Sequence, residues 1–89
     1  MSKLVMLSKP FGCGGCIGAK RHIEKRGIPV TILDAGKEEN IELAASRGHR
    51  QAPIFLEYAE DGTIVDSWSG FDPDRLDTYI PAVPEAVAA

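Results

Sequence analysis

The sequence predicts an α/β fold, with one four-stranded mixed sheet flanked by three helices in the order strand, helix, strand, helix, strand, strand, helix. Two apolar segments are each followed by a helical pattern, which is typical of parallel strands joined by right-handed crossovers. Further along, Glu60-Asp61-Gly62 separates two strand-like segments and indicates an antiparallel hairpin. The third observation is the position of Cys13 and Cys16, which lie where the first strand gives way to a helix.

The first strand and helix surround the two cysteines. An apolar run over Lys3–Leu7 predicts a buried strand, which ends at the loop that begins with Ser8. From residue 13 to residue 26 the pattern is helical, and Gly27 suits its C-terminal cap. We expect the inner face of this helix to consist of Cys16, Ala19 and Ile23.

The second strand and helix follow directly. β-Branched residues predict a strand over Ile28–Asp34, with Pro29 at its start, where a missing N–H is tolerated. The segment Glu38–Arg47 has acids in its first turns and Gly48 beyond its end, as expected of a helix. We expect its inner stripe to be formed by Ile41, Ala44 and Ala45.

The last third of the domain predicts a hairpin and a third helix. The hairpin strands are Ile54–Tyr58 and Thr63–Trp68. Asp72 can cap a helix that begins at Pro73 and is stopped by Pro81. Its inward side chains are expected to be Leu76 with Tyr79 or Ile80.

Length and composition fit a single small domain. The chain has 89 residues, 44% of them apolar, and a net charge of −3. We expect the domain to cover residues 1–80, with 81–89 as a flexible C-terminal tail. No secretion signal or membrane-spanning run is visible, so we expect a cytoplasmic protein. We also expect it to be a monomer. Mild acidity without a long basic run argues against nucleic acid as a partner.

This element order, with a Cys-x-x-Cys at the first strand-to-helix junction, is what the thioredoxin-like fold requires. We expect Cys13 at the exposed tip of the helix and Cys16 turned inward beneath it. The helix N-terminus would lower the pKa of Cys13 from its usual value of about 8.5, and Lys9 would add to this if its loop folds back. Gly14 and Gly15 allow a partner's backbone to approach closely. In a reducing cytosol, a cycling disulfide is expected rather than a structural one.

Ala52-Pro53 forms the second half of the predicted site. A proline at the start of the third strand can be cis, and the residue before it can offer its backbone N–H and C=O to a substrate strand. An ordinary trans proline at a strand end is the alternative. With the upstream cysteines in place, we expect the cis form.

Several motifs together resemble those of one family. They are Cys13-Gly-Gly-Cys16, Ala19-Lys20-Arg21, Arg50-Gln51-Ala52-Pro53, Trp68-Ser69-Gly70-Phe71 and Pro73-Asp74. In order and spacing, from Leu4 to Leu76, the chain resembles the NrdH-redoxins, glutaredoxin-like proteins with thioredoxin-like behaviour.

The resemblance implies a dithiol electron donor for a class Ib ribonucleotide reductase. Such a protein holds no bound cofactor beyond its redox-active disulfide, and thioredoxin reductase re-reduces it with NADPH as the ultimate source. Cys13 and Cys16 then carry over as the nucleophilic and resolving cysteines. The segment Trp68-Ser69-Gly70-Phe71 carries over as structural or partner-contacting residues beside the active site.

Two positions depart from the family pattern. The family commonly has Val-Gln between its cysteines, where this chain has Gly14-Gly15. It also has arginine where this chain has Asp72, a carboxylate at the place where glutaredoxins hold the amino group of glutathione. Asp72 therefore has two interpretations, a helix N-cap or a glutathione ligand, and a glutathione-dependent glutaredoxin remains the alternative function.

A zinc-binding or purely structural module is the alternative from another class. Zinc usually takes four ligands, and besides the cysteines only His22 and His49 offer imidazoles, so we predict no metal site and interpret both histidines as surface residues. Trp68 packs in the core with its indole N–H bonded locally, or it contributes to the site. Phe11 is either an exposed docking contact or a cover for the core.

Overall fold

The computed structural model describes residues 3–79, and it confirms the predicted α/β fold. The four strands are β1 (Lys3–Ser8), β2 (Val30–Asp34), β3 (Ile54–Tyr58) and β4 (Ile64–Ser69), and the three helices are α1 (Gly14–Arg26), α2 (Glu38–Ser46) and α3 (Pro73–Asp77). The sheet has the order β2-β1-β3-β4. Strand β1 runs parallel to β2 and antiparallel to β3, and β3 pairs antiparallel with β4.

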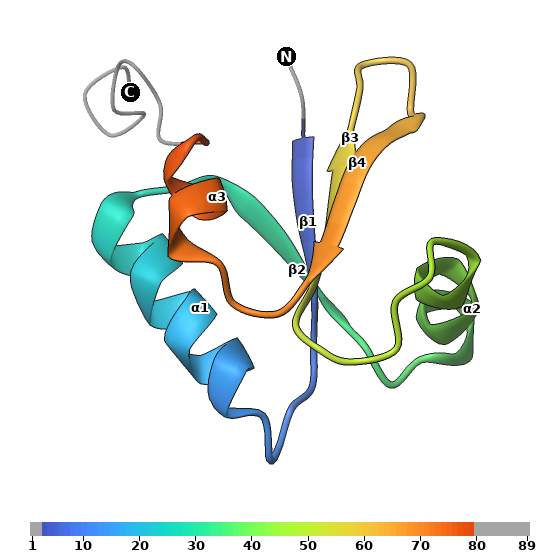
Figure 1. The fold of residues 1–89 in the computed structure, drawn as a ribbon, viewed down its shortest axis with the longest axis horizontal. Helices are drawn as coiled ribbons and strands as arrows, with labels where there is room; N and C mark the ends of the chain where they lie inside the picture. The colour runs from blue at the N-terminus through green and yellow to red at the C-terminus, as the bar shows by residue number, and fades with distance from the viewer. Residues whose placement is uncertain (1–2, 80–89) are drawn as a thin grey trace.

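The helices cover both faces of the sheet. Helices α1 and α3 lie together on one face, and α2 lies on the other (Figure 1). Strand β1 alternates between the two faces, as a central strand must. Leu4 and Met6 enter the cluster under α1 and α3, whereas Val5 and Leu7 enter the cluster under α2.

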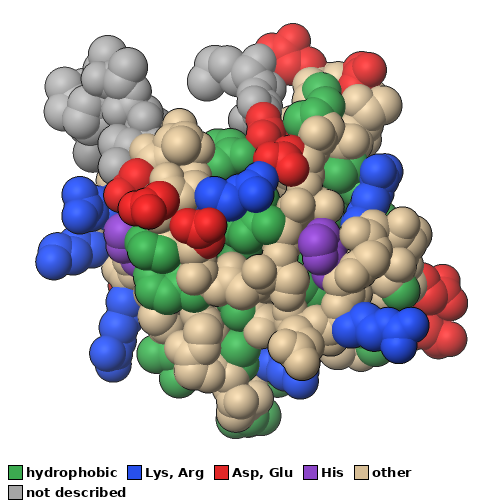
Figure 2. All heavy atoms as spheres, in the orientation of Figure 1, with side chains coloured by type: hydrophobic (Ala, Val, Ile, Leu, Met, Phe, Trp, Pro, Cys, Tyr) green, Lys and Arg blue, Asp and Glu red, His purple; other side chains and the backbone are tan. Residues whose placement is uncertain are grey.

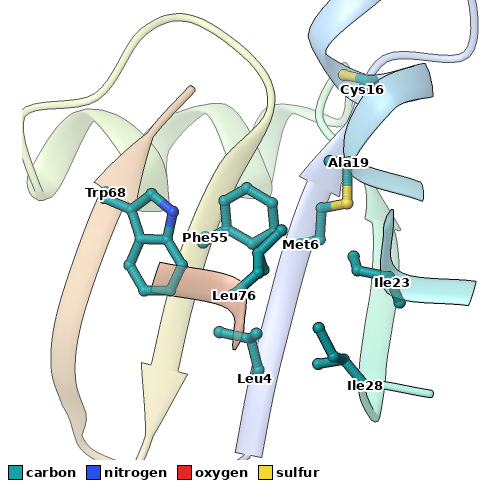
Figure 3. Close-up of a cluster of buried hydrophobic side chains, with 9 residues drawn as sticks. All are labelled: Leu4, Met6, Cys16, Ala19, Ile23, Ile28, Phe55, Trp68 and Leu76. Carbon is teal, nitrogen blue, oxygen red and sulfur yellow. The ribbon is translucent and has the colours of Figure 1, made fainter. Parts of the chain in front are cut away.

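The larger cluster fixes the position of the cysteine motif. Figure 3 shows Cys16 at one end of a continuous group of buried side chains that also includes Ala19 and Ile23 of the same helix. All three predicted inward residues of α1 are buried, at 1%, 0% and 7% exposure. Because Cys16 belongs to the core, the start of α1 packs against the sheet.

The predicted second strand is two residues too long. Ile28 is buried, and its backbone N–H donates to the carbonyl of Ile23, so it closes the end of α1 and precedes the strand. Gly27 provides this closure because it adopts a left-handed conformation, with φ of 67°. Strand β2 therefore begins at Val30.

The predicted inner stripe of α2 is wrong in two of its three residues. Ala44 is buried as expected, but Ile41 is 53% exposed and Ala45 is exposed. Leu43 packs against the core cluster instead. The apolar residues of this nine-residue helix, Ile41, Leu43, Ala44 and Ala45, fit more than one inner stripe, so the rotation of the helix about its own axis escapes sequence reasoning.

The third helix begins at Pro73, as predicted, and Leu76 is completely buried. It ends at Asp77, and Tyr79 packs against the larger core cluster beyond it. The expected tail and Ile80 lie outside the described residues. Within residues 3–79, none of the helices has the length and apolar character needed to cross a membrane.

Candidate active site

Cys13 and Cys16 form a disulfide, with their Cα atoms 5.2 Å apart. Cys13 is partly exposed, whereas Cys16 is 1% exposed and belongs to the core. The structure thus places the two sulfurs as the sequence predicts, one at the surface and one beneath it. A partner can reach only the first of them directly.

The backbone around Cys13 suits a negative charge on its sulfur. Cys13 is the N-cap of α1, and the N–H of Cys16 points at its Sγ atom at 3.1 Å. The first turn of α1 contains no acidic residue. After reduction, this N–H and the positive end of the helix dipole would stabilise a thiolate at Cys13.

The loop before β3 lies directly against the cysteine motif. The Ala52–Pro53 peptide bond is cis, as predicted, and the Ala52 carbonyl oxygen lies 3.6 Å from the Sγ atom of Cys13. A Cβ atom on Gly15 would come within 3.1 Å of the Pro53 ring. The glycine at this position therefore permits the close contact between α1 and the proline loop.

A hollow of about 300 Å³ opens beside Cys13. It brings together several residues that the sequence assigns to the site: Lys9, Gly14, Gly15, Gln51 and Ala52. Lys9 thus borders the same space as Cys13, which is the condition under which the sequence gives it a role at the motif. We call this space the cysteine hollow.

The segment Trp68-Ser69-Gly70-Phe71 is hydrogen-bonded to the loop that contains Gln51 and Pro53. Ser69 donates from its hydroxyl to the Gln51 carbonyl at 2.5 Å. The N–H of Gly70 donates to the Pro53 carbonyl at 2.8 Å, and Gly70 has a φ of 94° that favours glycine. These two bonds hold the proline loop against the end of β4.

Trp68 belongs to the core and not to the surface of the site. It is 6% exposed and stacks on Phe55, with ring centroids 5.0 Å apart. The Arg75 guanidinium also lies over the Trp68 ring, 4.3 Å from its centroid. The expected local bond of the indole N–H is wrong, since this atom has no hydrogen-bond partner within residues 3–79. Trp68 is therefore a structural residue of this fold.

Two phenylalanines present apolar surface near the motif. Phe71 is 40% exposed, and a Cβ atom on Gly18 would come within 3.2 Å of its ring. Phe11 is 87% exposed in the loop before the cysteines, so it does not cover the core. Both side chains are accessible to a partner that approaches Cys13.

Asp72 acts as the N-cap of α3. Its carboxylate accepts a hydrogen bond from the backbone N–H of Arg75 at 3.2 Å. This is the first of its two interpretations from the sequence, and it gives the carboxylate a role within the fold.

Replacing Asp72 with alanine is expected to lower the free energy of unfolding by about 1 kcal/mol, because the first turn of α3 loses its cap. Asp72→Asn is the matched control, since asparagine caps a helix about as well as aspartate. Urea denaturation of both variants measures the difference. Equal losses in the two variants would show that the charge matters and the cap does not.

Both histidines have specific partners, which corrects their interpretation as plain surface residues. His22 on α1 bonds through Nε2 to the carboxylate of Asp77 at 2.7 Å, and His49 bonds to the Ser67 hydroxyl at 2.9 Å. No local sequence pattern signals these pairs, because their members are far apart in the chain. Across the described part of the chain, no three or more His, Cys, Asp or Glu side chains are grouped to hold a metal ion.

Basic side chains follow the outer face of α1. Lysine and arginine project from this side of the molecule, while acidic side chains gather over α3 (Figure 2). Arg21, Lys25 and Arg26 are exposed, and Lys20 is partly buried. Within a chain of net charge −3, this helix provides a basic surface.

Comparison with known proteins identifies relatives in the family that the sequence motifs resemble. The chain is 33% identical over 78 residues to the glutaredoxin-like protein NrdH of Escherichia coli K12, a match that covers 86% of this chain and 88% of the relative. The NrdH protein of Shigella flexneri matches with the same identity and coverage. No family model matches the chain.

Solved structures agree with the sequence relatives. The structure of NrdH-redoxin from Escherichia coli superimposes with a TM-score of 0.73 at 29% identity, covering 91% of this chain and 99% of that one. Thioredoxin f2 from Chlamydomonas reinhardtii shares the fold, with a TM-score of 0.66 at 21% identity, covering 86% of this chain and 73% of that one. The chain therefore belongs to the NrdH family of glutaredoxin-like proteins, and it is a thiol–disulfide oxidoreductase with a thioredoxin-like fold.

Proposed function

We propose that this protein is a cytoplasmic electron donor that reduces a disulfide of a class Ib ribonucleotide reductase and is itself re-reduced by thioredoxin reductase. One observation carries the chemistry: Cys13 is partly exposed and its Sγ atom receives the N–H of Cys16, while Cys16 is buried in the core. The kinship with NrdH supports the choice of partners. The related Escherichia coli protein is described as having a thioredoxin-like activity profile.

The reaction follows from this arrangement. In the reduced protein, the Cys13 thiolate attacks one sulfur of the partner's disulfide, which forms a mixed disulfide and releases the partner's other thiolate. Cys16 then loses its proton and attacks the Sγ atom of Cys13. The Cys13–Cys16 disulfide forms, and the partner leaves with both of its thiols reduced. Two electrons pass to the partner in each cycle.

The positions around the cysteines provide the proposed contacts. Lys9, Gln51 and the Ala52 backbone border the cysteine hollow, where an extended segment of the partner would lie. Phe11 and Phe71 present apolar surface nearby. Arg50, Ser69 and Gly70 are the remaining positions that the family resemblance assigns to partner binding.

A coupled assay tests the proposed partners. NADPH consumption during disulfide reduction is measured once with thioredoxin reductase and once with glutathione and glutathione reductase. We expect turnover with thioredoxin reductase. Turnover only in the glutathione reaction would instead identify a glutathione-dependent glutaredoxin.

Cys16→Ser is expected to trap the mixed disulfide with a protein substrate, because the thiol that resolves it is missing. Non-reducing electrophoresis and mass spectrometry would show a covalent adduct through Cys13 that dithiothreitol releases. Steady-state reduction of protein disulfides should fall sharply in the same variant. If it works as well as the native protein, the two-cysteine mechanism is wrong.

A further inference from the structure

A second hollow adjoins the cysteine hollow on the α2 side of the sheet. Its volume is about 350 Å³, and its apolar walls are Ala35, Ile41, Ala44, Ala45, Ala52 and Ile54. We call it the α2 hollow. Lys9 and Ala52 line both spaces, so the two form one continuous surface that begins at Cys13.

The apolar wall includes a side chain that the fold leaves uncovered. Ile41 is 53% exposed because α2 turns it toward the α2 hollow and away from the core. Ala44 and Ile54, at the base, are 3% and 4% exposed and belong to the core cluster beneath α2. The buried apolar base and the exposed isoleucine beside it can together bury a large aliphatic side chain.

The rim of the α2 hollow is positive. Lys9 and Arg50 are both exposed, and neither side chain makes an ion pair or hydrogen bond with any residue between 3 and 79. His49 also lines the space, with its ring bonded to Ser67. No aspartate or glutamate is among the lining residues. The charge of this rim is complementary to a carboxylate.

We propose that the α2 hollow selects the partner's segment, by receiving a large aliphatic side chain close to the target cysteine while Lys9 and Arg50 bind a neighbouring carboxylate. This inference rests on the proposed function and specifies its substrate class. The Ala52 carbonyl oxygen lies 3.6 Å from the Sγ atom of Cys13, and Ala52 also lines the α2 hollow, so an extended segment bound at Cys13 continues past Ala52 into this space. The substrate is therefore an extended acidic segment with an aliphatic residue a few positions from its cysteine.

Synthetic peptides test this selection directly. Each peptide carries one cysteine as a mixed disulfide with thionitrobenzoate. Cys13 attacks the peptide sulfur and releases thionitrobenzoate, and Cys16 then releases the reduced peptide, which leaves the protein oxidised. One peptide has leucine and glutamate near its cysteine, a second has serine for leucine, and a third has lysine for glutamate. The mixed disulfide of glutathione serves as a fourth substrate, with carboxylates but no aliphatic side chain.

We expect the reduced protein to react with the peptide with leucine and glutamate with a second-order rate constant about tenfold higher than with the peptide with serine, as partial burial of one leucine would give. The peptide with lysine is also expected to react more slowly, because it places a like charge against Lys9 and Arg50. Equal rates with all four substrates would leave the proposed function standing and overturn the role of the α2 hollow. Fastest reaction with the glutathione substrate would overturn it as well. If no substrate is reduced, the proposed function itself is wrong, and the inference falls with it.

A pair of matched variants tests whether the preference for this peptide arises from the α2 hollow. Ile41→Glu puts a carboxylate against its apolar wall, and we expect it to remove the preference for the peptide with leucine and glutamate. Val65→Glu, at an equally exposed apolar residue of β4 that does not line the space, is expected to keep that preference. Should Ile41→Glu fail to fold by circular dichroism, Ala45→Glu on the same wall takes its place. An unchanged preference in the folded wall variant would contradict the proposal.

Discussion

Replacing Cys13 with serine is expected to slow the reduction of protein disulfides by at least about a thousandfold. A serine hydroxyl does not ionise near neutral pH, so the N–H of Cys16 would no longer stabilise a thiolate at the start of α1. The buried sulfur of Cys16, at 1% exposure, cannot take over the attack. Reduction of insulin by the variant with dithiothreitol as the electron source measures the loss.

The same substitution offers its own control for folding. Serine is a preferred N-cap residue, so Cys13→Ser keeps the helix start intact. We expect its thermal stability to match that of the reduced native protein. If the variant retains more than about a tenth of the native rate, a factor worth about 1.4 kcal/mol in activation free energy, the exposed cysteine is not the nucleophile.

Phe55→Ala is expected to lower the free energy of unfolding by about 3 to 5 kcal/mol. Phe55 is completely buried and stacks on Trp68 in the cluster that also contains Cys16 (Figure 3). The folded state of a domain is typically stabilised by only about 5 to 15 kcal/mol, so this loss is a large share of the total. Urea denaturation followed by circular dichroism measures it.

Phe11→Ala is the matched control, because it makes the same chemical change at a side chain that is 87% exposed. We expect its stability to change by less than about 0.5 kcal/mol. A loss close to that of Phe55→Ala would mean that Phe11 packs in the folded protein. A small loss at both positions would mean that the stacked cluster contributes little to stability.

The proposed substrate selection depends on Ile41, a residue of α2 whose position the sequence-based expectation gave wrongly. Ile41 is expected in the core on the basis of helical spacing, but it lines the α2 hollow instead. An exposed isoleucine next to the active site is therefore visible only once the rotation of this helix about its own axis is known. Ile41 is not needed in the core, and its place in the α2 hollow puts its side chain where a substrate bound at Cys13 would contact it.

Sequence reasoning alone predicts the features whose partner atoms lie within a few residues of one another. The Gly27 cap is of this kind, and so are the N-cap interpretation of Asp72 and the Cys13–Cys16 spacing that opens α1. The β3 strand has its predicted bounds because a turn signal and an apolar run define it locally. Local geometry and hydrophobic period are sufficient for these elements, and therefore for the fold class.

Which distant segments meet depends on the packing of the whole domain. It placed His22 of α1 beside Asp77 of α3, buried Trp68 in the core, and turned Ile41 outward. Each of these outcomes depends on how whole helices and strands settle on the sheet to fill space. Close packing is a property of the complete set of side chains, and no short stretch of sequence encodes it.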